Sequence, residues 1–168
     1  MTTQNADDGL AIAAYTALKA EQSSRISVRD NYALAYAASL ATLFFGYYST
    51  KNALILLAVP PVGFIGFHAY ATNDERISAI RTFLRDSLPP SMARAWETTH
   101  HQPDMTASIR GLLRLVASLL LFGGPAIAST IIVFSQSSSG ASIASATITG
   151  SSIILMLVTY IVLYRTPA

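Results

Sequence analysis

Two ionisable side chains lie inside apolar runs of the chain, and they are the first candidates for chemistry. His68 lies near the end of one run, and Arg114 lies about one turn into another. Titratable groups within a bilayer are energetically costly and often mark ion paths, gates or proton relays. In the alternative, Arg114 is an anchor whose guanidinium reaches the membrane surface, and His68 bonds to a neighbouring helix or to water. These runs contain no Asp or Glu, which disfavours a carboxylate-driven transporter.

Other kinds of chemistry have little support in the sequence. Glu97 and His100 have the spacing of two ligands on one helical face, but a di-metal bundle needs further carboxylates and a second such motif. The absence of cysteine excludes thiolate sites, and no phosphate-binding loop or nucleophile elbow is present. A net charge of +2 without a basic stripe argues against nucleic acid. We expect a non-enzymatic protein with no metal and no cofactor.

The composition predicts a membrane protein. Hydrophobic residues make up 52% of the 168 residues and charged residues only 12%, about half the charged share of a soluble domain. The acidic residues are confined to the first thirty positions and to the region 74–104. Four apolar runs approach the roughly 20 residues that a membrane-spanning helix needs. They are residues 31–48, 52–71, 111–134 and 143–164.

Lys and Arg in the connecting segments predict how the chain is oriented. They gather in the N-terminal tail, in the central segment and at Arg165, whereas the two short connections between runs carry only Lys51. We therefore expect an all-α membrane protein with both termini in the cytoplasm and four transmembrane helices arranged as two hairpins. The expected parts are a cytoplasmic N-terminal helix (1–30), hairpin 1 (31–72), a cytoplasmic amphipathic helix and loop (73–110), hairpin 2 (111–164) and a tail (165–168).

The cytoplasmic segments show helical signals of their own. Asn73 is suited to be an N-cap, and Ile77, Ile80, Leu84 and Leu88 form an apolar stripe after it. This stripe lies either on the lipid surface or against another part of the protein, and we expect a lipid-surface or partner-binding role for Arg76, Arg81 and Arg85. In the N-terminal tail, Glu21 and Arg25 are spaced for an i,i+4 ion pair, and the helix is expected to continue into the first crossing.

Two apolar runs are interrupted near their middle. Pro60 and Pro61 remove backbone donors from the second run, so its helix must kink or break there. Gly63 and Gly66 permit close approach of another helix. The third run has a similar interruption at Gly123, Gly124 and Pro125. These positions are either ordinary kinks with small-residue packing or, together with His68 and Arg114, parts of a gate.

The fourth run opens with many small and hydroxyl-bearing residues, between positions 142 and 152. Ser and Thr at such positions pack helices closely and hydrogen-bond between them. The same composition would also line a weakly selective aqueous pore, and the sequence leaves both readings open.

Two motifs carry a family resemblance over about the first hundred residues. "SVRDN" (27–31) precedes the first crossing and "NDERISAI" (73–80) follows the second. In these motifs the chain resembles a family of small, uncharacterised bacterial integral membrane proteins, which implies the bacterial inner membrane as its location. The layout of helix, two-crossing hairpin and cytoplasmic helix is also similar to SLATT-type membrane effectors, although the second hairpin departs from it. The latter similarity implies a role in permeabilising the membrane during bacterial antiviral defence.

Two functions follow as hypotheses. The first is a non-enzymatic, channel-like membrane effector; because four helices enclose little space, its path would form between copies in a homo-oligomer. The second is a membrane anchor or scaffold that holds a cytoplasmic protein partner through the N-terminal and central helices. The expected partners are thus the lipid bilayer, further copies of the chain and a cytoplasmic protein.

Overall fold

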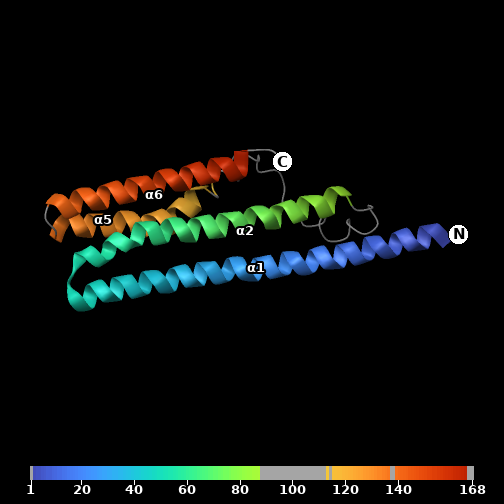
Figure 1. Ribbon diagram of the computed structural model, residues 1–168, viewed down its shortest axis with the longest axis horizontal. Helices are drawn as coiled ribbons and strands as arrows, with labels where there is room; N and C mark the ends of the chain where they lie inside the picture. The colour runs from blue at the N-terminus through green and yellow to red at the C-terminus, as the bar shows by residue number, and fades with distance from the viewer. Residues whose placement is uncertain (1, 88–112, 114, 137–138, 166–168) are drawn as a thin grey trace.

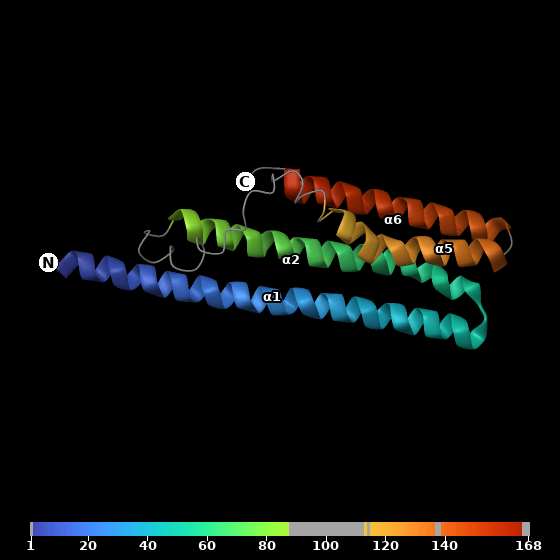
Figure 2. The same cartoon turned by 180° about the vertical axis from the view of Figure 1, so that it is seen from behind.

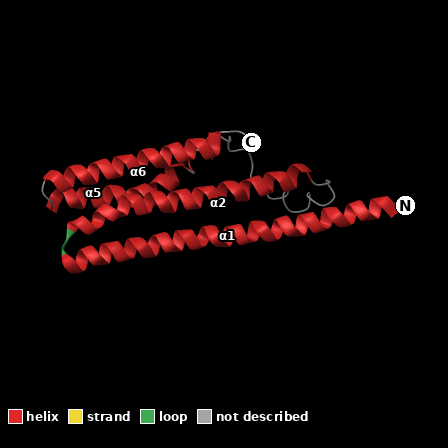
Figure 3. Ribbon diagram, viewed as in Figure 1, coloured by secondary structure: helices red, strands yellow, loops and turns green. Residues whose placement is uncertain are grey.

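The computed structural model describes the chain except for residues 1, 88–112, 114, 137–138 and 166–168. The described residues form four α-helices with one 3₁₀ and one π-helical segment, and they contain no strand. The helices lie side by side along one axis (Figure 1), and the view from behind gives the same arrangement (Figure 2). Almost every described residue is helical (Figure 3), so the prediction of an all-α protein is confirmed.

The first helix, α1 (Thr2–Thr50), is unbroken over 49 residues. At 1.5 Å per residue it is about 74 Å long, much longer than a bilayer core is thick. The expected continuity between the N-terminal helix and the first apolar run is therefore confirmed. The predicted ion pair is also present, with Arg25 Nη2 2.6 Å from Glu21 Oε1.

A tight turn connects α1 to the next helix. The N–H of Lys51 donates to the carbonyl of Tyr47 at 2.8 Å, and Lys51 has a positive φ of 56°. The Asn52 side chain then accepts from the N–H of Leu54 and caps a 3₁₀ helix, η1 (Ala53–Ala58). The chain thereby reverses, and α1 and the following helix form an antiparallel pair (Figure 1).

The second α-helix, α2 (Val59–Ser87), is continuous through the position where a new helix was expected. The predicted N-cap role of Asn73 is wrong, since its side-chain amide donates to the Ala69 carbonyl within the helix at 3.0 Å. No Gly or Pro lies between Phe67 and Ser87 to stop the helix, so the capping signal is overridden. The predicted boundary between residues 72 and 73 falls inside α2.

The second half of the described chain packs on α2. The π-helical segment η2 (Leu119–Gly123) leads directly into α5 (Gly124–Gln136), and α6 (Ser139–Arg165) returns beside it. The first part of α1 and the last part of α2 extend beyond α5 and α6 as a two-helix projection (Figures 1 and 2). We call this part, residues 9–30 with 73–84, the projection.

Three helices in the described chain are long and apolar enough to cross a membrane. They are Ala53–Leu84, which joins η1 to α2, then Leu115–Gln136 and Gly140–Leu163. Three of the four expected crossings therefore have a matching helix by length and composition, the fourth run among them. The apolar part of α1 is not among the helices that are long and apolar enough by this criterion. Tyrosines at positions 32, 36, 47 and 48 reduce its hydropathy.

The core lies between α2, η2 and α6. Phe67, Phe122 and Met156 are at most 1% exposed and form its centre, with Tyr36 of α1 and Ala71 of α2 beside them. A second cluster, around Leu56, Val59 and Val133, lies where η1 meets α5. Side chains therefore fill the interior of a single chain at the level of the interrupted helices.

Candidate functional site

The interruption in the third apolar run is a π-helical turn. The N–H of Gly124 donates to the carbonyls of both Leu119 and Leu120, which widens the helix at η2. The next residue, Pro125, has no N–H to donate to the carbonyl four residues earlier, that of Leu121. The expected interruption at Gly123, Gly124 and Pro125 is therefore confirmed, and the Leu121 carbonyl lacks the i+4 N–H that an α-helix would supply.

Tyr36 of α1 donates to this carbonyl. Its hydroxyl lies 3.2 Å from the Leu121 carbonyl oxygen and 3.2 Å from that of Phe122. Tyr36 is only 5% exposed, and its bond to the Phe122 carbonyl is buried. A hydrogen bond of this kind contributes about 0.5–1.5 kcal/mol, so the Tyr36 contact stabilises the packing of the π-helical turn on α1.

The two glycines of α2 allow the turn to approach. A Cβ on Gly63 would lie 2.7 Å from the Phe122 carbonyl oxygen, closer than such atoms come in proteins. A Cβ on Gly66 would lie 3.1 Å from the Tyr36 ring and 3.3 Å from that of Phe122. The predicted close approach at Gly63 and Gly66 is confirmed. We refer to Tyr36, Gly63, Gly66, Leu121 and Phe122 together as the crossing contact.

Aromatic rings continue from the crossing contact toward the projection. The Phe122 ring centroid lies 4.8 Å from that of Tyr36 and 5.9 Å from that of Phe67, the latter edge to face. On the side toward the projection, the centroid of Tyr70 is 5.8 Å from that of Phe122. Such offset and edge-on arrangements are the favourable ones for aromatic pairs.

An ion-pair cluster lies at the end of this row of rings. Arg29 of α1 has its Nη1 3.4 Å from Asp74 Oδ1 of α2 and its Nη2 3.1 Å from Asp30 Oδ1. Its guanidinium carbon is 5.5 Å from the centre of the Tyr70 ring, within cation–π range. Burial opposes the charged guanidinium, but the hydrogen bond to Asp30 and the nearby carboxylates outweigh it and raise the pKa of Arg29 above its ordinary value. The Arg29 guanidinium is therefore charged at every pH at which the protein is folded.

The prolines of the second run lie where they disturb the helix least. Pro60 and Pro61 are in the first turn of α2, directly after the 3₁₀ segment, where backbone N–H groups have no intrahelical acceptor. The expected break is confirmed, since the run divides into η1 and α2 at these residues. Pro60 is buried and Pro61 is exposed.

Of the predicted ionisable residues, the structure describes His68, which takes no part in the crossing contact. His68 is on an exposed face of α2, with its ring 6.1 Å from that of Phe64. Arg114 lies outside the described residues, as do Glu97 and His100. The gate role of His68 and Arg114 stays a prediction. The described residues contain no group of three or more potential metal ligands.

The hydroxyl-rich run of α6 packs against α5. Thr130 and Thr149 have their hydroxyl oxygens 2.6 Å apart, and Ser145 donates to Thr130 at 3.3 Å. Ser142 and Ser152 are 6% exposed and lie on the same face of α6. Of the two readings of this run, helix packing is the one found for these residues.

The apolar stripe of the projection is likewise packed on protein. Ile77 and Leu84 are 5% and 1% exposed, where α2 runs beside α1 (Figure 1). Arg76 and Arg81 are exposed, whereas the side chain of Arg85 lies outside the described part. Lipid-surface or partner binding by these three arginines stays a prediction.

The sequence did not lead to Tyr36 or to the Arg29–Asp74 pair as site residues. One signal for Tyr36 was available: a tyrosine within an apolar run needs an acceptor, and Pro125 has no N–H to donate to the carbonyl four residues earlier. For Arg29 and Asp74 the signal was that each stands at the polar end of an apolar run.

Comparison with known protein families, with characterised proteins and with solved structures gives no match to the chain. The resemblance seen in the two sequence motifs therefore stays a prediction.

Proposed function

We propose that the chain is a non-enzymatic membrane protein that assembles as a homo-oligomer and acts as a channel-like effector. The projection would receive the signal, and the π-helical turn would be the part of the bundle that responds. One observation carries this proposal. An unbroken series of contacts joins the Arg29–Asp74 pair to the turn through Tyr70, Phe122 and Tyr36.

Four crossings are part of the proposal. Arg29 and Asp74 face each other where the apolar part of α1 begins and that of α2 ends. The two apolar lengths thus lie side by side and end at one level, so a bilayer that contains α2 would also contain this part of α1. The hydroxyl of Tyr36 is satisfied inside the bundle, which lowers the cost of a tyrosine at this depth.

The conducting path would lie between copies of the chain. Phe67, Phe122 and Met156 fill the interior of one chain at the level of the turn. Large apolar side chains cover its outer faces, for example Leu120 at 69% and Ile131 at 64% exposed. Loss of the Tyr36 hydrogen bonds would let the π-helical turn rearrange, and the faces next to it are those that a second copy would meet.

The voltage across the membrane of expressing cells tests this function. Tyr36→Phe removes the donor while it keeps the ring. If the contact is worth about 1.4 kcal/mol in the shut state, the open population rises about tenfold. We expect a voltage-sensitive dye to report depolarisation with Tyr36→Phe at matched expression. The control is Tyr32→Phe, at a ring that is 43% exposed, and it should behave as the wild type. Equal potentials in all three strains would contradict the channel.

An anchor is the second candidate, and the projection favours it. The two helices of the projection extend past α5 and α6 (Figure 2), and Leu10 and Ile12 of α1 are exposed. An anchor predicts unchanged voltage in every variant. It also predicts that a chain shortened by residues 2–20 still inserts in the membrane but no longer retains a soluble protein that the full chain retains.

A further inference from the structure

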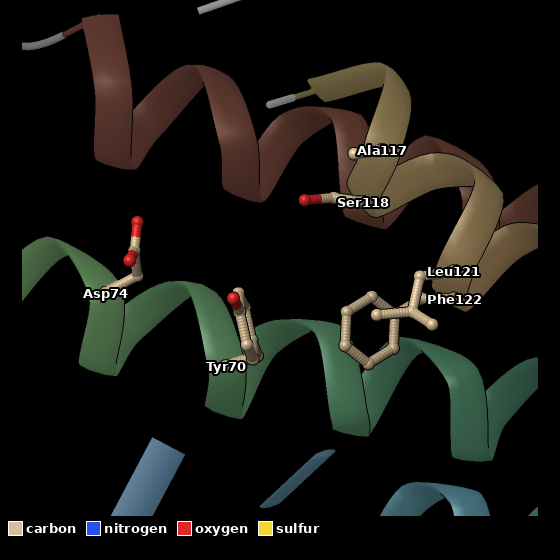
Figure 4. A pocket seen from close by; sticks show the side chains of 6 residues that line it. All are labelled: Tyr70, Asp74, Ala117, Ser118, Leu121 and Phe122. Carbon is tan, nitrogen blue, oxygen red and sulfur yellow. The ribbon is translucent and has the colours of Figure 1, made fainter. Parts of the chain in front are cut away.

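A pocket lies between α2 and the segment that leads into α5, and its volume is about 150 Å³. It is lined by Tyr70, Asp74, Ala117, Ser118, Leu121 and Phe122. In Figure 4 the side-chain oxygens of Tyr70 and Ser118 point into the same space, whereas Leu121 and Phe122 lie at its other end. The pocket thus has a polar end and an apolar end.

Two hydroxyl groups at the polar end are available to a ligand. Within the described part of the chain, neither the Tyr70 nor the Ser118 hydroxyl has a hydrogen-bond partner, and Ser118 does not cap the π-helical segment that follows it. The two groups come from different segments of the chain and face one space (Figure 4). A hydroxyl can both donate and accept a hydrogen bond. The pair therefore suits an alcohol group, which accepts from one hydroxyl and donates to the other.

The charges around the pocket favour an uncharged ligand. The Asp74 carboxylate lies 3.4 Å from the Arg29 guanidinium and takes part in a further interaction within the protein. Because this carboxylate already has partners in the protein, it provides no unpaired charge for a cation. None of the six lining residues is basic, so the lining offers an anion no opposite charge either.

The volume limits what fits inside the pocket. An apolar cavity of about 150 Å³ admits a molecule the size of benzene, so this pocket has room for about six carbon or oxygen atoms. Leu121 is 52% exposed, so the apolar end opens toward the outer surface of the bundle. A longer alkyl chain can therefore leave the pocket over this leucine. A ligand in this position contacts α2 and the π-helical turn at the same time.

The two ends of the pocket are ordered like a membrane leaflet. Asp74 is in the first charged stretch after the apolar part of α2, whereas Leu121 and Phe122 are in an apolar run. In a bilayer that contains the apolar part of α2, the polar end lies toward the headgroups and the apolar end toward the acyl chains. We propose that this pocket binds the hydroxyl-bearing end of an uncharged amphiphile. The source is a neutral glyceride lipid or a free alcohol, and neither requires the protein to conduct ions.

Binding is tested with the purified full chain in nanodiscs of phosphatidylcholine, a lipid that has no hydroxyl group. The probe is an octanol that carries a photoreactive diazirine in its chain, and mass spectrometry locates the adduct on the protein. We expect a saturable adduct on the residues that line the pocket. Excess 1-hexanol should suppress this adduct, whereas 1-chlorohexane, which has the same chain without a hydroxyl, should not. An adduct that is absent from the lining, or that both competitors suppress equally, overturns the proposal.

Variants of the lining test the two hydroxyls separately. Tyr70→Phe and Ser118→Ala each remove one hydroxyl, and each should raise the half-saturating concentration of the probe about two- to tenfold, the effect of one hydrogen bond. Tyr32→Phe and Ser39→Ala, at exposed positions outside the pocket, should label as the wild type does. Ala117→Leu fills the pocket from an exposed position and should abolish the adduct, which keeps the test valid if a hydroxyl variant fails to fold. Labelling that survives Ala117→Leu, or that neither hydroxyl variant changes, overturns the site.

Dioleoylglycerol added to the nanodiscs distinguishes the two sources of the ligand. If a neutral glyceride lipid is the natural ligand, dioleoylglycerol suppresses the adduct as 1-hexanol does. If a free alcohol is the ligand, labelling is unchanged by dioleoylglycerol and is still suppressed by 1-hexanol. Both results support the pocket, and they differ only in where its ligand comes from.

Discussion

The Tyr36 hydroxyl and the Leu121 carbonyl, 85 residues apart in the chain, lie 3.2 Å from each other in the core of the bundle. The contact joins α1, the longest of the described helices, to the π-helical turn that precedes Pro125. Pro125 has no N–H for the Leu121 carbonyl, and the Tyr36 hydroxyl donates to it. The π-helical turn in the third run therefore contacts α1 as well as α2.

Loss of the Tyr36 hydroxyl should destabilise the protein. Tyr36→Phe keeps the packing with Phe122 and removes the hydroxyl that the Leu121 and Phe122 carbonyls share. We expect a loss of about 0.5–1.5 kcal/mol, measured as a lower midpoint of thermal unfolding by circular dichroism in detergent. Tyr32→Phe, the exposed control, should shift the midpoint by far less. Equal shifts for the two variants would show that the hydroxyl is not needed.

Substitution by alanine should have opposite effects on stability at Gly63 and at Gly124. Gly63→Ala places a methyl group 2.7 Å from the Phe122 carbonyl, so α2 and η2 must separate at a cost of about 1–3 kcal/mol. At Gly124 a Cβ would meet nothing within 4 Å, so Gly124→Ala should be neutral or stabilising by up to about 1 kcal/mol. Unfolding in increasing denaturing detergent compares the two. A neutral Gly63→Ala would refute the close approach.

The hydroxyl pair between α5 and α6 should be coupled. Thr130 and Thr149 are 2.6 Å apart, and such bonds between membrane helices average about 0.6 kcal/mol. A double-mutant cycle with Thr130→Val and Thr149→Val should yield a coupling of that order. Thr147 is the control, since its hydroxyl bonds only within α6 to Ile143 and faces outward, so Thr147→Val combined with Thr130→Val should be additive. Additivity in both cycles would mean that the packing, and not the hydrogen bond, holds the two helices.

The number of crossings can be read from single cysteines, because the chain has none of its own. Ser24→Cys, Ser49→Cys and Ser135→Cys are near-isosteric changes at exposed positions. With four crossings, a membrane-impermeant maleimide added to intact cells labels positions 49 and 135, and labels position 24 only after permeabilisation. Labelling of 24 and 49 from the same side would show that α1 does not cross.

The sequence predicted the helices and their interruptions better than their partners. Length and hydropathy are local properties, so the apolar runs of α2, α5 and α6 were visible, and so were the breaks at Pro60 and Pro125. The error at Asn73 is local too: a capping residue does not end a helix that has no Gly or Pro near it.

Contacts between distant residues could not be predicted from length, hydropathy or other local properties. Tyr36 and Leu121 meet because two distant helices pack in one register, and no spacing in the chain encodes that register. The face that Ser145 and Thr149 present to α5 was equally undetermined, since the same residues suit a pore or a packed interface. Composition therefore predicts whether a helix lies in lipid or in water, but it does not predict which residues of other helices it contacts.

The most direct test of the central claim is to measure ion flux across the membrane of liposomes that contain only the purified protein and lipid. The account predicts low flux for the wild type and for Tyr32→Phe, and about tenfold higher flux for Tyr36→Phe at equal protein content. Flux that stays at the level of empty liposomes for all three proteins would contradict a channel held shut by the crossing contact.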